Sequence, residues 1–258
     1  MDAIRNHIVE ATQSPDLQAF VRDLLIEICA IDTTPFADVS RMRDAESAVF
    51  DILERELKQL GFAGAKRERR PVNPAISTHP AYSQLHFTKT PERPDGLPPE
   101  TVYAERSNLL YMVPGKDGYQ GPDGVAVNAH IDVVKPYIPP RLEGNIVCGR
   151  GSCDDKGAIV TMIAALKVLD QALKQTGTCL QRNLVNMFVI EEETGGNGSL
   201  SLAIDRELKT LFDSILVLEC AGNNVHPANR GAVWYRADLT CPEVNLFEMF
   251  AFVIEQLE

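Results

Sequence analysis

The sequence predicts an α/β fold: an open, mixed but largely parallel sheet flanked by helices on both faces. Short apolar runs bounded by Gly or Pro alternate with segments of helical periodicity, as in a sheet whose strands are joined by crossover helices. The expected strands lie at 108–113, 124–134, 184–190, 214–219 and 231–239. The expected helices between them lie at 157–175 and 198–208.

Two amphipathic helices are expected ahead of these strands, at 17–29 and 44–60, because apolar side chains recur there at three- and four-residue spacing. Residues 71–100 hold seven of the 16 prolines and little periodicity, so they predict an irregular insertion. We favour a solvated surface insertion over a flap across an active site, and a solvated face for the basic run at 66–70.

The domain organisation follows from these elements. We expect one domain over residues 1–240 and, at 241–258, a terminal amphipathic helix with an apolar face that has no evident partner.

Net charge limits the classes of partner. The formal charge of −11 opposes binding to nucleic acid or to an anionic membrane, and it favours small molecules or peptides. No window holds the roughly 20 apolar residues that a membrane-spanning helix needs, and the first residues do not resemble a signal peptide. We therefore expect a cytoplasmic protein.

Polar residues cluster directly after the apolar runs, where sites form in open α/β sheets. They are His130, Asp132, Asp154, Asp155, Glu191, Glu192, Glu193 and Glu219. One imidazole and several carboxylates at one sheet edge would repel each other unless a cation neutralised them, and this mixed set favours zinc or another first-row divalent ion. Each part alone has a simpler explanation, namely a hydrogen-bonded histidine, a solvated loop or a helix cap.

Three ordered motifs in this region carry a family resemblance. HIDVV at 130–134, GRGSCDDKG at 149–157 and EEETGGNGS at 191–199 resemble the motifs of the dizinc exopeptidases and amidohydrolases. That family includes glutamate carboxypeptidases, dipeptidases, aminoacylases, acetylornithine deacetylases and succinyl-diaminopimelate desuccinylases. The resemblance covers roughly residues 105–235. It also implies an inserted second domain, which would be missing at the terminal helix expected at 241–258.

The resemblance implies the metal ligands. His130 and Glu219 would bind one zinc, Glu193 would bind the second, and Asp154 would bridge the two. Cobalt or manganese are the possible substitutes for zinc. The family's last ligand of the second zinc is a histidine from a later segment, which has no counterpart here, so we expect that site to be incomplete and the two sites to be unequally occupied. His226 is a possible substitute, although a surface role is favoured for a loop histidine.

The resemblance also implies the catalytic roles. Glu192 would be the general base that takes a proton from the attacking water and delivers it to the leaving amine. Asp132 would accept a hydrogen bond from the other ring nitrogen of His130 and so fix its tautomer. The peptide bond between Asp154 and Asp155 is expected to be cis.

The cysteines are scattered without a CxxC pair, so we expect reduced thiols. Cys153 and Cys220 each lie one residue from a proposed ligand, and thiolate is a good ligand of zinc. Burial of both as small apolar side chains is nevertheless the favoured expectation.

The expected function is zinc-dependent hydrolysis of an amide or peptide bond in a small peptide or N-acyl amino acid, by a monomer whose activity could be impaired by truncation. A non-catalytic, metal-stabilised binding module is the alternative, although such a module has no need of the base Glu192. A serine or cysteine hydrolase has little support, because no G-x-S-x-G elbow is present. The choice among carboxypeptidase, dipeptidase, deacetylase and desuccinylase remains open.

Overall fold

The computed structural model describes residues 2–119, 121, 123–220, 222, 224–228 and 245–257. The chain divides into two compact units, Met1–Cys220 and Ala221–Glu258. The proposed metal ligands, with Glu192 and Asp132, all lie in the first unit. The described part of the second unit contains one helix, α7 (Leu246–Leu257), and the strand expected at 231–239 lies outside the described residues.

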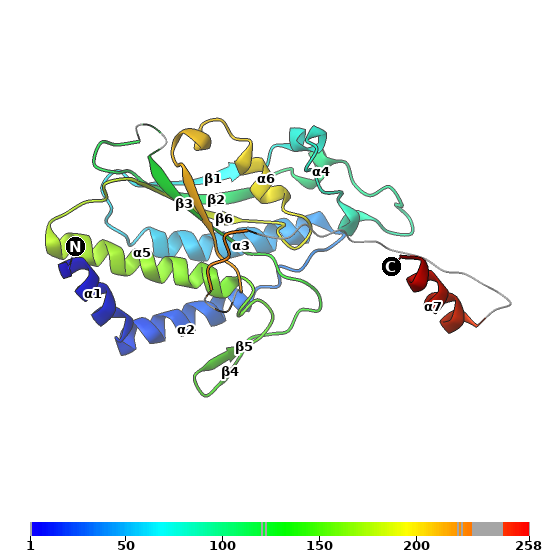
Figure 1. Cartoon of the computed structure of the whole chain (residues 1–258), viewed down its shortest axis with the longest axis horizontal. Coiled ribbons are helices and arrows are strands. Elements are labelled where there is room, and N and C mark those ends of the chain that lie inside the picture. The colour runs from blue at the N-terminus through cyan, green and yellow to red at the C-terminus, as the bar shows by residue number, and fades with distance from the viewer. Residues whose placement is uncertain are drawn as a thin grey trace. The chain divides into compact units, whose positions relative to one another are not determined.

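A five-stranded sheet forms the centre of the first unit (Figure 1). Its strands, in spatial order, are β1 (Lys66–Pro71), β2 (Ser107–Val113), β6 (Asn183–Val189), β3 (Gly124–His130) and β7 (Ser214–Val217). β3 is parallel to both of its neighbours, whereas β2 is antiparallel to β1 and β6. Four strands therefore run in one direction, which confirms the predicted mixed, largely parallel sheet.

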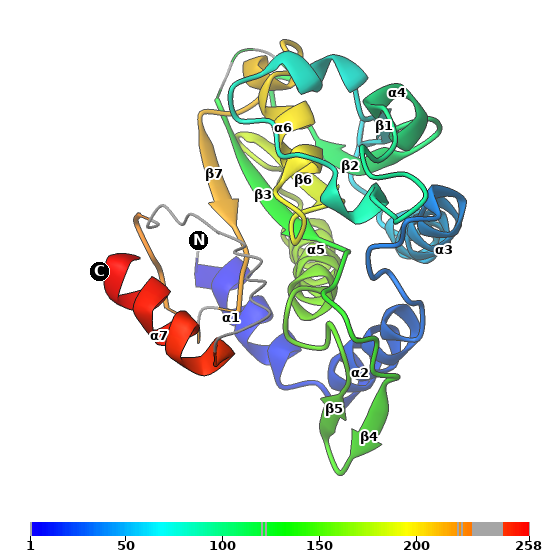
Figure 2. The same ribbon diagram turned by 90° about the vertical axis from the view of Figure 1, so that its right-hand side faces the viewer.

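Alternate side chains of the central strands enter two separate cores, as the two-residue period of a strand requires. On one face, Leu109, Tyr111 and Phe188 join a cluster with helices α2 (Pro15–Cys29), α3 (Val39–Leu57) and α5 (Lys156–Thr176). On the other face, Leu110 and Met187 pack with the region of α6 (Asn197–Ala203) and η3 (Leu208–Thr210). Figures 1 and 2 show these helices on opposite sides of the sheet.

Several elements were not expected from the sequence. Helix α1 (Asp2–Thr12) precedes α2, and the basic run at 66–70 belongs to the edge strand β1. A separate hairpin is formed by β4 (Arg141–Glu143) and β5 (Ile146–Cys148). Helix α6 ends at Ala203 instead of reaching residue 208, and strand β3 ends at His130 instead of continuing to residue 134.

The proline-rich segment is irregular, as predicted, but it is not a purely solvated insertion. It contains η1 (Pro74–Thr78), η2 (His86–Thr88) and α4 (Pro99–Val102). Ile76 and Leu85 are buried in the same core as α3 and α5. Apolar residues spaced without a regular period still add to a core when the segment folds back over it, so composition alone misplaced this segment.

Within the described ranges of the chain, no helix is both long enough and apolar enough to cross a membrane.

Candidate metal centre

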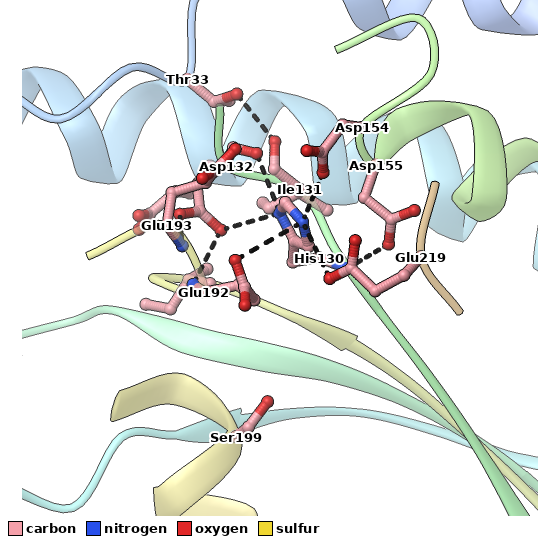
Figure 3. A network of polar contacts seen from close by, with 12 residues as sticks. Thr33, His130, Ile131, Asp132, Asp154, Asp155, Glu192, Glu193, Ser199 and Glu219 are labelled. Atoms are coloured by element: carbon pink, nitrogen blue, oxygen red, sulfur yellow. Dashed lines mark hydrogen bonds and ion pairs between the residues drawn. The ribbon is translucent and has the colours of Figure 1, made fainter. Parts of the chain in front are cut away.

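The site begins at His130, the last residue of β3. Its side chain is 2% exposed because β3 lies between β6 and β7 in the sheet. The ring Nε2 is 3.1 Å from Asp154 Oδ1 and 3.8 Å from both Glu192 Oε2 and Glu219 Oε1. Figure 3 shows these carboxylates gathered around the imidazole. The carboxylates come from the turns after β6 and β7 and from the turn before α5. They therefore meet at the histidine that ends β3.

Asp154 and Asp155 come from the turn that leads into α5. Asp155 Oδ2 accepts a hydrogen bond from the His130 main-chain N–H at 3.1 Å, which fixes this turn to the end of β3. The peptide bond between Asp154 and Asp155 is cis, as the resemblance implied. Behind the turn, buried Lys156 donates hydrogen bonds from Nζ to the carbonyl oxygens of Ile28 and Ile31. The start of α5 is thereby attached to the end of α2.

Asp132 lies beside ring nitrogen Nδ1 of His130 and also holds the next turn. The hydrogen-bond partner of His130 Nδ1 is the main-chain carbonyl of Asp132 at 3.0 Å, whereas the nearest carboxylate oxygen is at 3.4 Å. The carboxylate also accepts hydrogen bonds from the main-chain N–H groups of Glu192 at 3.1 Å and Glu193 at 3.0 Å. One residue thus directs Nε2 of His130 toward the carboxylates and also holds the turn that follows β6.

A second set of contacts holds this turn from behind, and the sequence did not predict it. Glu191 is 1% exposed and has a left-handed backbone with φ of 62°. Its carboxylate accepts hydrogen bonds from Arg106 Nη1 and from the Tyr103 hydroxyl at 2.9 Å. Arg106 also forms a two-point ion pair with buried Glu46 on α3. The available sequence signals were Arg106, two residues before the apolar run at 108–113, and a third glutamate in the motif.

Several carboxylates lie close together in the centre, and their burial and mutual repulsion raise their pKa values. Burial, followed by the charge of Asp154, raises the pKa of Glu193 to about 7. Burial also raises the pKa of Asp155 to about 7, and its Oδ1 is a buried oxygen without a hydrogen-bond partner in the described structure. Burial raises the pKa of Glu192 as well, as expected for a carboxylate beside an apolar strand.

His130 carries the compensating charge in the metal-free chain. Burial lowers its pKa, but the hydrogen bond and charge of Asp132, with Asp155 and Glu192, raise it to about 10. A bound divalent cation would take over this compensation, and the imidazole would then be neutral.

Three groups of side chains in the described residues have ligand atoms within 4.8 Å of one another. They are His130 with Asp154 and Glu193, His130 with Glu192 and Glu219, and Asp154 with Glu219 and Cys220. All four proposed ligands and the proposed base therefore meet in one place. His226, the possible substitute ligand, is exposed and lies in the second unit.

The two cysteines beside the site are exposed, so the expectation that they are buried as apolar side chains is wrong for Cys153 and Cys220. By contrast, Cys29 at the end of α2 is fully buried. The difference follows from position, because turns at the open end of a sheet face solvent whereas the inner face of a helix does not.

Comparison with known proteins gives a family match over the whole site. Residues 126–231, which include all three motifs and Glu219, match the model of Peptidase family M20/M25/M40. A Peptidase M20 domain-containing protein of Schizosaccharomyces pombe is 36% identical over 87 residues, which are 33% of this chain and 20% of that protein. A probable carboxypeptidase of Aspergillus terreus is 30% identical over 149 residues, 49% of this chain and 33% of that protein.

Solved structures share the fold at low identity. Human carnosine dipeptidase 1 has a TM-score of 0.55 and 18% identity, with 83% of this chain and 40% of that chain covered. The di-peptidase Dug1p from Saccharomyces cerevisiae has a TM-score of 0.53 and 20% identity, with 84% and 40% covered. The chain thus spans a third or less of these curated relatives and 40% of each of these two solved chains.

A largely parallel sheet with a histidine and carboxylates at its strand ends has its candidate site where open α/β sheets bind ligands. The comparisons confirm the resemblance to the dizinc exopeptidases and amidohydrolases, and the site-bearing segment matches Peptidase family M20/M25/M40. This family implies a divalent metal.

Proposed function

We propose that this chain carries the catalytic site of a zinc-dependent hydrolase that cleaves an amide or peptide bond in a small substrate. The convergence of Asp154, Glu192 and Glu219 on Nε2 of buried His130 is the observation that supports this function most directly. A cluster with this much negative charge is costly without a cation. The names of the related proteins, which include carboxypeptidases and dipeptidases, support the same reaction.

The donor set fits zinc. One imidazole and several carboxylates suit zinc, cobalt or manganese better than calcium or magnesium, which prefer all-oxygen surroundings. His130 and Glu219 would hold one ion, Glu193 would hold another, and Asp154 would bridge them.

The residues of this chain divide the catalytic work. When bound, the metal would polarise the substrate carbonyl and make water a stronger nucleophile. Glu192 would accept the proton of the attacking water and return it to the leaving amine, and burial favours this by keeping its carboxylate basic. The carboxylate of Asp132 keeps Glu192 in place by accepting a hydrogen bond from its main-chain N–H.

The proposed substrates are small peptides or N-acyl amino acids. Small amide substrates agree with the names of the relatives, which include a dipeptidase and a carboxypeptidase. The net charge of −11 disfavours nucleic acid and anionic membranes as partners. The cytoplasmic location and the monomeric state remain predictions from the sequence.

The test is a hydrolysis assay of the zinc-loaded chain with dipeptides and N-acyl amino acids, together with its metal content. Glu192→Gln should retain zinc and lose about 10²- to 10⁴-fold in rate, because it removes proton transfer alone. His130→Ala should lose zinc and activity together. Glu192→Gln with undiminished hydrolysis would contradict the proposed base, whereas a zinc-loaded chain that hydrolyses nothing in the panel would support the binding-module alternative.

A further inference from the structure

The turn that carries Glu192 and Glu193 is also tied to the proline-rich segment, by contacts that the function proposed above does not use. Asn197, at the start of α6, is 1% exposed. Its side-chain Oδ1 accepts a hydrogen bond from the Ser83 main-chain N–H at 3.0 Å, and its Nδ2 donates to the Ser83 carbonyl oxygen at 2.9 Å. One buried amide therefore pairs with both main-chain groups of a single residue in the segment.

The same amide is connected to the residue that precedes the proposed base. Asn197 Nδ2 also donates to the Tyr103 hydroxyl at 2.9 Å, and that hydroxyl donates to the Glu191 carboxylate at 2.9 Å. Tyr103 directly follows α4 and is 2% exposed. A continuous chain of hydrogen bonds thus joins Asn197 to the residue directly before Glu192.

The turn and the proline-rich segment also meet at a glycine. Ser83 Oγ donates a hydrogen bond to the Gly195 carbonyl oxygen at 2.7 Å. A Cβ atom at Gly195 would collide with the side chain of Ser83, so a larger residue at this position would push the two segments apart. The Gly195 N–H donates in turn to the Glu192 carbonyl oxygen at 3.0 Å. A displacement of Ser83 would therefore move the main chain of the turn that carries Glu192.

The position of Glu192 depends on this main chain. Its side chain is 44% exposed, so packing around the carboxylate does not fix it. Displacement of a catalytic group by about 1 Å can lower a rate by about 100-fold. Buried hydrogen bonds that hold the turn at its far end, as Asp132 holds it at the near end, therefore have a direct effect on proton transfer.

We propose that Asn197 is a positioning residue for Glu192, and that the proline-rich segment supports Asn197 through Ser83 and Tyr103. This inference rests on the role of Glu192 in the proposed function. It gives the segment a part in the site that differs from both the solvated insertion and the flap considered from the sequence. Long irregular segments within compact domains are often functional, and this one contacts the turn of the proposed base.

Steady-state kinetics of zinc-loaded Asn197→Ala, with a dipeptide that the parent chain hydrolyses, test the inference. Asn183→Ala is the matched control. Asn183 is 3% exposed, and its amide likewise joins two main-chain groups, the N–H of Gly115 and the carbonyl of Leu211, at the opposite end of β6. Both variants lose buried hydrogen bonds, so a merely structural effect appears in both.

Asn197→Ala should lose about 10- to 100-fold in kcat with KM and zinc content unchanged, because only an interaction in the transition state is weakened. Hydrogen exchange of the metal-free chain should be faster in peptides that cover residues 191–197 in Asn197→Ala than in Asn183→Ala. Asn183→Ala should keep the kcat of the parent chain. Ser83→Ala should change kcat in the same direction by less, and it takes the place of Asn197→Ala if that variant does not fold.

An unchanged kcat in the variant that folds overturns the inference and leaves the proposed function intact. An equal fall in Asn183→Ala, a fall matched by loss of zinc, or exchange at 191–197 that is no faster than in Asn183→Ala has the same meaning. A zinc-loaded parent chain that hydrolyses no dipeptide or N-acyl amino acid overturns the proposed function, and the role of Asn197 with it.

Discussion

The two sides of the metal centre are built differently, although both follow strands parallel to β3 in the same sheet. After β6, the turn with Glu192 and Glu193 is held by Asp132 in front and by the Arg106 network behind. After β7, the exposed residues Glu219 and Cys220 follow a strand whose four residues are all exposed. One side is fixed by the fold, and the other lies at a sheet edge.

The difference shows which parts of the site the fold prepares in advance. The proposed base Glu192 needs an accurate position before substrate arrives, and buried charge-assisted hydrogen bonds provide it. Glu219 can be drawn into position by the metal itself, so it does not need a buried support. The metal should therefore order the β7 side more than the β6 side.

The largest expected effect comes from breaking the buried support. Arg106→Met leaves Glu46 and Glu191 buried without their cation, so we expect the free energy of unfolding to fall by about 3 to 5 kcal/mol. Chemical denaturation of the metal-free chain measures this loss. Arg141→Met is the matched control, because its ion pair with Glu143 is exposed and screened by solvent, so its removal should leave the free energy of unfolding nearly unchanged. Equal losses in the two variants would show that the network does not support the turn.

Zinc binding is the next largest effect. Zinc at about 100 times its dissociation constant should raise the free energy of unfolding by about 2.7 kcal/mol. Hydrogen exchange should slow most in peptides that cover Ser214–Glu219, because an exposed edge strand opens locally at low cost. His130→Ala should show neither change. Equal slowing in β6 and β7 would contradict the proposed difference between the two sides.

Asp132→Asn tests the front support of the turn. The amide keeps one acceptor oxygen, but its NH₂ group would face a main-chain N–H, so one charge-assisted hydrogen bond is lost at a cost of about 1.5 kcal/mol. The hydrolysis rate should fall while zinc content stays unchanged. Asp123→Asn, at an exposed ion pair with Arg182, is the control. A normal rate in Asp132→Asn would mean that the carboxylate is not needed to position Glu192.

The sequence was most informative where local patterns determine structure. The strands at 108–113 and 184–190 were recognisable from their apolar runs, and they do form the centre of the sheet. The carboxylates at strand ends could be expected to meet because the carboxyl ends of parallel strands share one edge. His130 and Asp154 are accordingly in contact, as the motifs implied.

Contacts that depend on tertiary structure were missed. Nothing near Arg106 in sequence indicates that it pairs with Glu46, 60 residues away, and Glu191, 85 residues away. The two hydrogen bonds of the Asp132 carboxylate likewise join segments that only the folded sheet brings together. The exposure of Cys220 depends on which strand forms the edge, which an apolar run cannot reveal.

The smallest expected effect compares the same substitution on both sides. Ile190, directly after β6, is fully buried, whereas Ile215 in β7 is 54% exposed. Ile190→Val should lower the free energy of unfolding by about 0.5 to 1.5 kcal/mol, because the removed methylene leaves a cavity. Ile215→Val should change it by less than about 0.5 kcal/mol. Equal costs, measured by chemical denaturation of the metal-free chain, would mean that β7 is packed as tightly as β6, and the metal would then have no looser side to order.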